Sequence, residues 1–114
     1  MQARQSRVPA SLMVNKYVDG TPFVSVVKDI SASGILLFTP IEPFHQSQAN
    51  VVLEFGISGA GGPVWVDARL SRHAYDGLQA FEFTDLKPSV KNHLHAFVND
   101  ELGRIRTVEP CFNG

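Results

Sequence analysis

The chain has 114 residues, of which 44% are hydrophobic and 18% charged, with a formal net charge of −1. This length and composition predict one folded domain and exclude a disordered chain. The near balance of charge argues against binding of nucleic acid polymers or anionic membranes through bulk basicity. The single cysteine, Cys111, excludes an internal disulfide and a multi-cysteine zinc site. Without a membrane-length apolar run or a signal segment, we expect a cytoplasmic protein with no membrane insertion.

The sequence pattern predicts six strands separated by turn signals. The predicted strands are rich in β-branched residues or alternate in polarity, and Leu12, Val14 and Lys16 share one face of the first. In chain order the predicted strands cover residues 12–17, 23–30, 35–38, 50–57, 64–75 and 78–83. The connections are the turn Asp19-Gly20, the polar segment 31–34, the loop 40–49, the glycine-rich loop 58–63 and the hairpin turn Asp76-Gly77.

One helix is predicted near the end of the chain. Pro88-Ser89 begins it, because proline is favoured in a first helical turn, and Gly103 is expected to cap its end. A single apolar stripe runs along this helix and consists of Val90, Leu94, Phe97, Val98 and Leu102. Residues 104–114 are expected to form a tail.

Six short strands with one helix favour an all-β fold, a six-stranded antiparallel β-barrel closed by the C-terminal α-helix. Barrel closure removes exposed strand edges, and one amphipathic helix can cover an open end. A barrel of this size has an interior filled by side chains, so we expect any ligand site on its outer surface or rim. Trp65 is expected to pack on the barrel or under the helix.

Two polar segments interrupt this apolar pattern and are the candidate functional elements. The first is the arm Arg4-Gln5-Ser6-Arg7-Val8-Pro9, and the second is the turn Asp29-Ile30-Ser31-Ala32-Ser33-Gly34. Asp29 and Ser31 are two residues apart, which places both side chains on one face of an extended segment. Gly34 allows a positive φ or a close approach of the backbone to another group.

Together these segments resemble the PilZ domain family, whose members bind the bacterial second messenger cyclic di-GMP. That family has an Arg-x-x-x-Arg arm before its first strand and an Asp/Asn-x-Ser-x-x-Gly turn, and Asp29, Ser31 and Gly34 match the turn fully. The resemblance covers residues 4–102. The arm departs from the family pattern, since Arg4 and Arg7 are three residues apart and Ala3 stands four before Arg7.

The resemblance implies a receptor or adaptor that regulates motility, pili or surface attachment. Arg4 and Arg7 would contact guanine and phosphate groups, Asp29 and Ser31 the edge of a base, and Gly34 would allow close backbone approach. The implied organisation is a basic arm (residues 1–9), a PilZ-like barrel with its helix (10–103) and a tail (104–114). Cyclic di-GMP would be a regulatory ligand, and no cofactor is expected.

Three other functions fit the sequence to different degrees. A PilZ-like module that binds a protein partner in a motility or signalling pathway, without cyclic di-GMP, is the main alternative, because the arm departs from the family spacing. An oligonucleotide-binding barrel would need a basic, aromatic face, and the balanced charge disfavours it. An enzyme is not expected, because Cys111 and the four histidines, His45, His73, His93 and His95, form no catalytic or metal-binding pattern.

Overall fold

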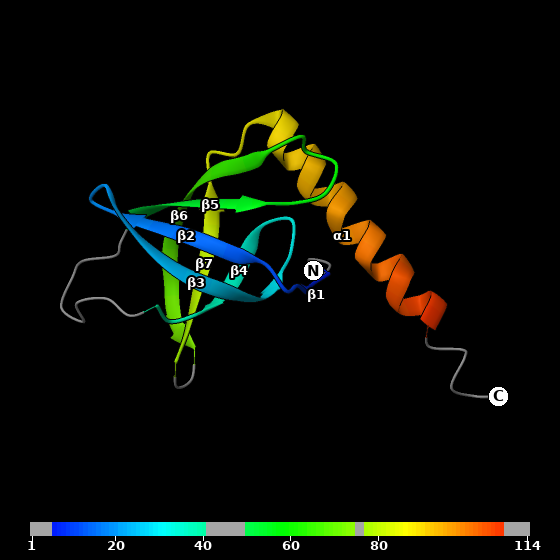
Figure 1. Ribbon diagram of the computed structural model, residues 1–114, viewed down its shortest axis with the longest axis horizontal. Helices are drawn as coiled ribbons and strands as arrows, with labels where there is room; N and C mark the ends of the chain where they lie inside the picture. The colour runs from blue at the N-terminus through cyan, green and yellow to red at the C-terminus, as the bar shows by residue number, and fades with distance from the viewer. Residues whose placement is uncertain (1–5, 41–49, 75–76, 109–114) are drawn as a thin grey trace, which may run out of the picture.

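The computed structural model describes residues 6–40, 50–74 and 77–108, with the side chains of 72–74 and 106–108 outside this description. Its elements in chain order are β1 (Val8–Pro9), β2 (Met13–Val18), β3 (Thr21–Ile30), β4 (Gly34–Phe38), β5 (Asn50–Gly56), β6 (Pro63–Ala74), β7 (Leu78–Thr84) and α1 (Pro88–Val108). Strands β2 to β7 form a closed antiparallel ring in the order β3-β2-β5-β6-β7-β4, with β4 pairing back onto β3 (Figure 1). This confirms the predicted six-stranded barrel with one C-terminal helix.

The alternating residues of the strands separate the barrel core from its outer surface. On β5, for example, Val51, Leu53 and Phe55 are buried, whereas Val52 and Glu54 are partly exposed. The tight turn between β2 and β3 has positive φ angles at Asp19 and Gly20, as the Asp-Gly pair predicts. Residues 41–49 of the predicted loop 40–49 and Asp76 of the predicted turn Asp76-Gly77 lie outside the described residues, whereas Gly77 has a positive φ.

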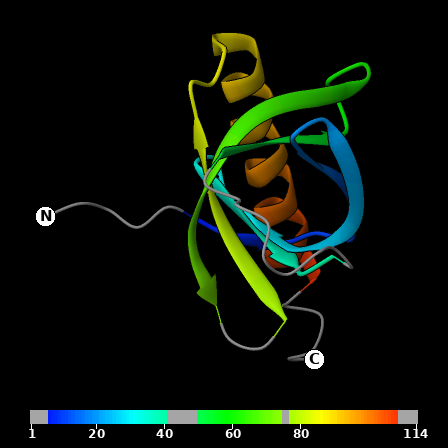
Figure 2. The ribbon, with the colours of Figure 1, turned by 90° about the vertical axis from the view of Figure 1, so that its left-hand side faces the viewer.

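Helix α1 adds its apolar stripe to the barrel core. Leu94, Phe97 and Val98 are buried and belong to the same hydrophobic cluster as the inward side chains of the strands. Figures 1 and 2 show α1 along the side of the barrel where β1 and the β5–β6 connection lie. No helix within the described ranges is long and apolar enough to cross a membrane.

The predicted end of the helix at Gly103 is wrong, because α1 continues to Val108. A glycine inside a helix costs only about 1 kcal/mol relative to alanine, so it does not by itself end a helix. Here Arg104 forms an ion pair with Glu101, one turn earlier, and this pair spans the glycine position. The first residues of the predicted tail are therefore helical.

The inward face of β2 carries a charged residue. Lys16 is completely buried, and its Nζ donates a hydrogen bond of 3.0 Å to Oε1 of Gln79 on β7. The ammonium group also lies 5.6 Å from the centre of the Phe81 ring, within the range of a cation–π contact. The sequence pattern placed Lys16 with Leu12 and Val14 but did not indicate its partner, which lies 63 residues away.

We predict that Gln79→Leu lowers the free energy of unfolding by about 1.5–3 kcal/mol, because a buried charged donor loses an acceptor. Urea denaturation measures this change. Gln79→Glu is the control, because it keeps an acceptor oxygen at similar reach and should lose less stability than the leucine variant. Equal unfolding midpoints for Gln79→Leu and the unaltered chain would contradict the prediction.

Candidate functional site

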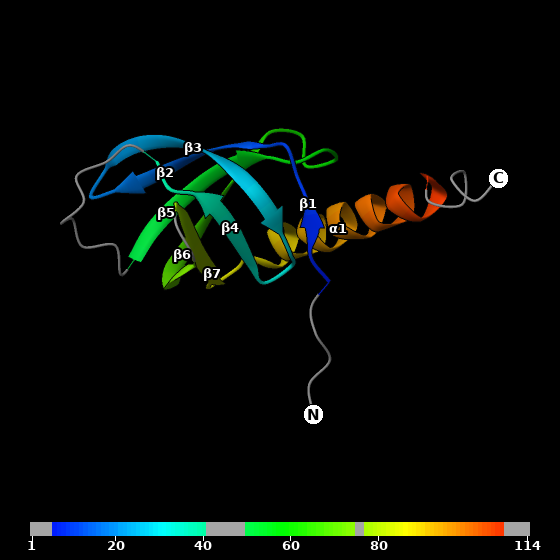
Figure 3. The same ribbon diagram turned by 90° about the horizontal axis from the view of Figure 1, so that it is seen from below.

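Strand β1 brings the N-terminal arm to the polar turn. Val8 pairs with Ile30 and Pro9 with Asp29 in an antiparallel arrangement, and Figure 3 shows β1 beside the end of β3. The Val8 side chain is completely buried in the core, which anchors the arm. Arg7 directly precedes this strand, so the pairing places it next to Asp29. The resemblance implied that arm and turn act on one ligand and so lie together, but the sequence did not predict a strand in the arm.

Arg7 and Asp29 form a direct ion pair. The Nε atom of Arg7 donates to Oδ1 of Asp29 at 2.8 Å. Their side chains remain 44% and 25% exposed, so solvent and a ligand can reach both groups. An exposed pair of this kind contributes at most about 1 kcal/mol to stability. Its significance is therefore that it places a guanidinium and a carboxylate together on the outer surface.

A bulge in β3 determines the side on which Asp29 lies. Val27 pairs with Leu37 and Asp29 with the next residue back, Leu36, so β3 contains one extra residue at this point. Val27 is buried and Asp29 is partly exposed, although they are two residues apart and would share a face in a regular strand. The bulge therefore turns Asp29 outward, a role that β-bulges often have beside functional sites.

Ser31 stabilises the turn from inside. It is completely buried, and its Oγ accepts hydrogen bonds from the backbone N–H groups of Ser33 (3.2 Å) and Gly34 (3.1 Å). The backbone N–H of Ser31 also donates to the Gly34 carbonyl at 2.9 Å. The expectation that Asp29 and Ser31 present the same face is wrong, because Asp29 reaches Arg7 at the surface while Ser31 holds the turn together. This is the local role that serine often has in turns.

Gly34 allows β4 to lie close to β7. A Cβ atom at this position would be 2.7 Å from the carbonyl oxygen of Phe81, which is closer than real Cβ contacts. Gly34 pairs with Glu82, and the carbonyl of the preceding Ser33 accepts a hydrogen bond of 2.9 Å from Phe83. Two roles were predicted for Gly34, a positive φ or a close approach of the backbone to another group. The structure shows the second, since the backbone of Gly34 lies close to strand β7.

A hollow of about 220 Å³ lies beside the turn. Strands β4, β6 and β7, the turn and the arm contribute its lining residues Arg7, Ser33, Gly34, Leu36, Ser71, Ala80, Phe81 and Glu82. The carboxylate of Glu82 forms an ion pair with Arg69 on β6, which offsets its negative charge. Ser71, Glu82 and Arg69 were not predicted as site residues. The sequence predicted the strand 64–75 that contains Arg69 and Ser71 but did not indicate that these residues lie near the turn.

Of the predicted site residues, the structure brings Arg7 and Asp29 together at the surface and buries Ser31 and Gly34 in the turn beside them. Arg4 lies outside the described residues, so its role stays a prediction. Within the described part of the chain, no three His, Cys, Asp or Glu side chains come close enough to hold a metal ion. The site therefore consists of a guanidinium, a carboxylate and a rigid polar turn.

These features define a small closed barrel whose N-terminal arm is attached to a polar turn on its outer wall. The sequence matches the PilZ domain family over residues 2–100, and the chain belongs to this family. A search of the curated proteins finds no match.

Several solved structures share the fold. The PilZ domain of YcgR from Escherichia coli with c-di-GMP has a TM-score of 0.68 and 17% identity, covering 94% of this chain and 96% of that one. The K. pneumonia MrkH–c-di-GMP complex has a TM-score of 0.71 and 14% identity, and the match covers 94% of this chain and 55% of that one. The Bacillus subtilis inhibitor of motility (MotI/DgrA) has a TM-score of 0.68 and 16% identity, and the match covers 95% of this chain and 53% of that one. This chain therefore spans nearly all of the first structure and about half of the other two.

We predict that Gly34→Ala lowers the free energy of unfolding by about 1–3 kcal/mol, because the new methyl group collides with the backbone of β7. Urea denaturation measures the loss. Gly56→Ala is a matched control, since Gly56 also lies in a strand but a Cβ there meets nothing within 4 Å. Its effect should stay within about 0.5 kcal/mol. Similar losses in both variants would show that the contact with Phe81 is unimportant.

Proposed function

We propose that this chain is a bacterial cyclic di-GMP receptor or adaptor domain that holds the ligand between its arm and the Asp29–Gly34 turn. The observation that carries the proposal is the 2.8 Å contact between Arg7 and Asp29, which joins the two segments of the family motif on the outer wall. Membership of the PilZ family supports it. The PilZ domain of YcgR from Escherichia coli and MrkH from K. pneumonia, both solved with c-di-GMP, have the same fold.

The chemistry of the two exposed groups suits a guanine nucleotide. The Arg7 guanidinium can donate two hydrogen bonds to O6 and N7 of guanine, or stack on the base while its charge offsets a phosphate. The Asp29 carboxylate can accept hydrogen bonds from the N1–H and N2–H groups on the Watson–Crick edge of guanine. A ligand would exchange the ion pair between Arg7 and Asp29 for contacts of its own with each partner.

The remaining motif residues would act through the shape of the turn. Ser31 and Gly34 fix the backbone conformation and its distance from β7, so that the exposed Ser33 borders the hollow. The ion pair of Glu82 with Arg69 matters here, because an unpaired carboxylate would repel a phosphate. Arg69 is thus a positioning residue that supports an anionic ligand through Glu82.

The size of the hollow implies that the ligand lies mostly across the surface. About 220 Å³ is less than the roughly 300–1,000 Å³ usual for pockets that enclose a drug-sized ligand. One base or phosphate could enter the hollow, while the rest of the molecule rests on the arm and the turn. Arg4, on the same arm, is proposed to contribute there.

A second candidate function, a protein-interaction module without nucleotide, is favoured by an apolar strip on the barrel. Met13, Val24, Val26 and Phe38 are 61%, 56%, 40% and 48% exposed. Met13 pairs with Val26 across β2 and β3, and Val26 and Phe38 line one groove. Exposed apolar groups gathered in this way are typical of surfaces that bind other proteins.

The proposed output is control of motility, pili or surface attachment through a protein partner in the cytoplasm, without catalysis or a cofactor. PilZ domains are typically binding or adaptor modules. One solved structure with this fold, from Bacillus subtilis, is that of an inhibitor of motility. No nucleic acid polymer or inserted membrane is part of the proposal.

Titration calorimetry with cyclic di-GMP tests the receptor function. We expect micromolar binding by the full chain and a loss of about ten- to hundredfold in affinity for Arg7→Ala and Asp29→Ala, because each removes a charged hydrogen-bonding group. Both variants should remain folded by circular dichroism, since the exposed ion pair contributes little to stability.

Arg104→Ala is the matched control, because Arg104 is also an exposed arginine in an ion pair but lies on α1. Its affinity should equal that of the unaltered chain. No binding heat from a folded, unaltered chain at high ligand concentration would overturn the receptor function and favour the interaction module.

A further inference from the structure

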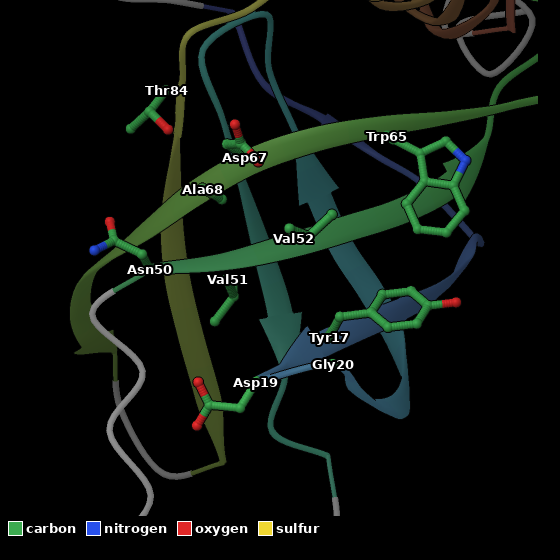
Figure 4. A pocket seen from close by; sticks show the side chains of 10 residues that line it. All are labelled: Tyr17, Asp19, Gly20, Asn50, Val51, Val52, Trp65, Asp67, Ala68 and Thr84. Atoms are coloured by element: carbon green, nitrogen blue, oxygen red, sulfur yellow. The ribbon is translucent and has the colours of Figure 1, made fainter.

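A larger hollow, of about 580 Å³, lies on another part of the barrel wall. Strands β2, β5, β6 and β7 and the β2–β3 turn form it, and it shares no residue with the hollow beside Arg7. Figure 4 shows its lining residues Tyr17, Asp19, Gly20, Asn50, Val51, Val52, Trp65, Asp67, Ala68 and Thr84. Neither family motif accounts for this site.

Two aromatic rings form one end of the hollow. The rings of Tyr17 and Trp65 lie 5.3 Å apart at an angle of 32°, and Figure 4 shows them together on one side. Tyr17 pairs with Val52, and Trp65 pairs with Glu54, so the two rings meet diagonally across β5. Trp65 packs against Tyr17 on the outer wall of the barrel, one of the two expected placements, and remains 53% exposed. An indole supported by a neighbouring ring presents an open face to solvent.

The polar groups around the rings are acidic. Asp19 and Asp67 line the hollow, and none of its described lining residues is a lysine, arginine or histidine. Beside the rings, Glu54 accepts hydrogen bonds from Tyr17 Oη (2.9 Å) and Asn15 Nδ2 (3.1 Å). The bond to Glu54 raises the pKa of the Tyr17 phenol above its ordinary value, so this hydroxyl stays neutral. The local field therefore favours a cation.

We infer that this hollow binds an arginine side chain within a basic segment of a partner protein. A guanidinium stacks favourably on an indole and can also donate two parallel hydrogen bonds to a carboxylate. Trp65 and Asp67 are two residues apart on β6 and share its outer face, which separates them by about 7 Å along the strand. One arginine side chain can contact both. Lysine, a compact and strongly hydrated charge, has no planar group that can stack on the indole or donate two parallel hydrogen bonds to the carboxylate.

The charge of the hollow argues against a nucleotide as its occupant. Phosphates would face Asp19 and Asp67 without a cationic side chain among the described lining residues. The inference is therefore independent of the proposed nucleotide site. It assigns the partner a basic, arginine-containing surface and places the contact on β2, β5 and β6.

Fluorescence titration tests the inference, because Trp65 is the only tryptophan in the sequence and lies in the hollow. The full chain is titrated with hexaarginine and, separately, with hexalysine. We expect saturable quenching of Trp65, with hexaarginine bound about two- to fivefold more tightly than hexalysine because of stacking. Binding should weaken when salt is raised from low to high concentration.

Charge-removing variants locate the site. Asp67→Asn and Asp19→Asn should each weaken hexaarginine binding about two- to fivefold, as expected for exposed ion pairs. Asparagine tolerates the positive φ at position 19, so that variant keeps the turn. The matched control Asp100→Asn removes an exposed carboxylate from α1 and should leave the affinity unchanged. Equal affinities for the two peptides, or equal weakening by all three variants, would overturn the inference.

Discussion

The short pairing of β1 with the end of β3 is the constraint on which the candidate nucleotide site depends. Val8 is completely buried opposite Ile30, and burial of a valine contributes about 1.5–3 kcal/mol. That anchor brings Arg7 to Asp29, whereas their own ion pair, being exposed, is too weak to order an arm. An apolar residue thus determines where a functional cation lies.

The candidate site also depends on a short turn that has one motif side chain at the surface and another in the protein interior. The β3 bulge directs Asp29 outward, while Ser31 directs its hydroxyl inward to the backbone N–H groups of the turn. Gly34 then lets the turn lie against β7. The Asp-x-Ser-x-x-Gly spacing is therefore explained by backbone geometry as much as by ligand chemistry, with one residue exposed and two that shape the support beneath it.

The closed barrel lets one small domain present separate surfaces of different character. The wall beside the arm carries the Arg7–Asp29 pair and the Arg69–Glu82 pair, whereas the wall formed by β2, β5 and β6 carries two aromatic rings and carboxylates. Paired strands with a filled interior hold these surfaces in fixed relation. Even the buried Lys16 is held by a hydrogen bond across the barrel to β7. The proposed nucleotide contact and the proposed partner contact therefore lie on separate walls of the barrel.

The sequence by itself determined the six barrel strands, the start of the helix and the barrel, because alternation and turn residues are local properties, whereas the family resemblance indicated which segments share a site. It did not determine where the helix ends, since the cost of Gly103 is small. Nor did it determine that Ser31 is buried, that Trp65 is exposed, or that Arg69, Ser71 and Glu82 border the turn. Those facts arise from a bulge, a strand register and contacts between distant segments. They depend on how the strands align in the closed barrel, because a shift of one residue in register exchanges the inner and outer faces of a strand.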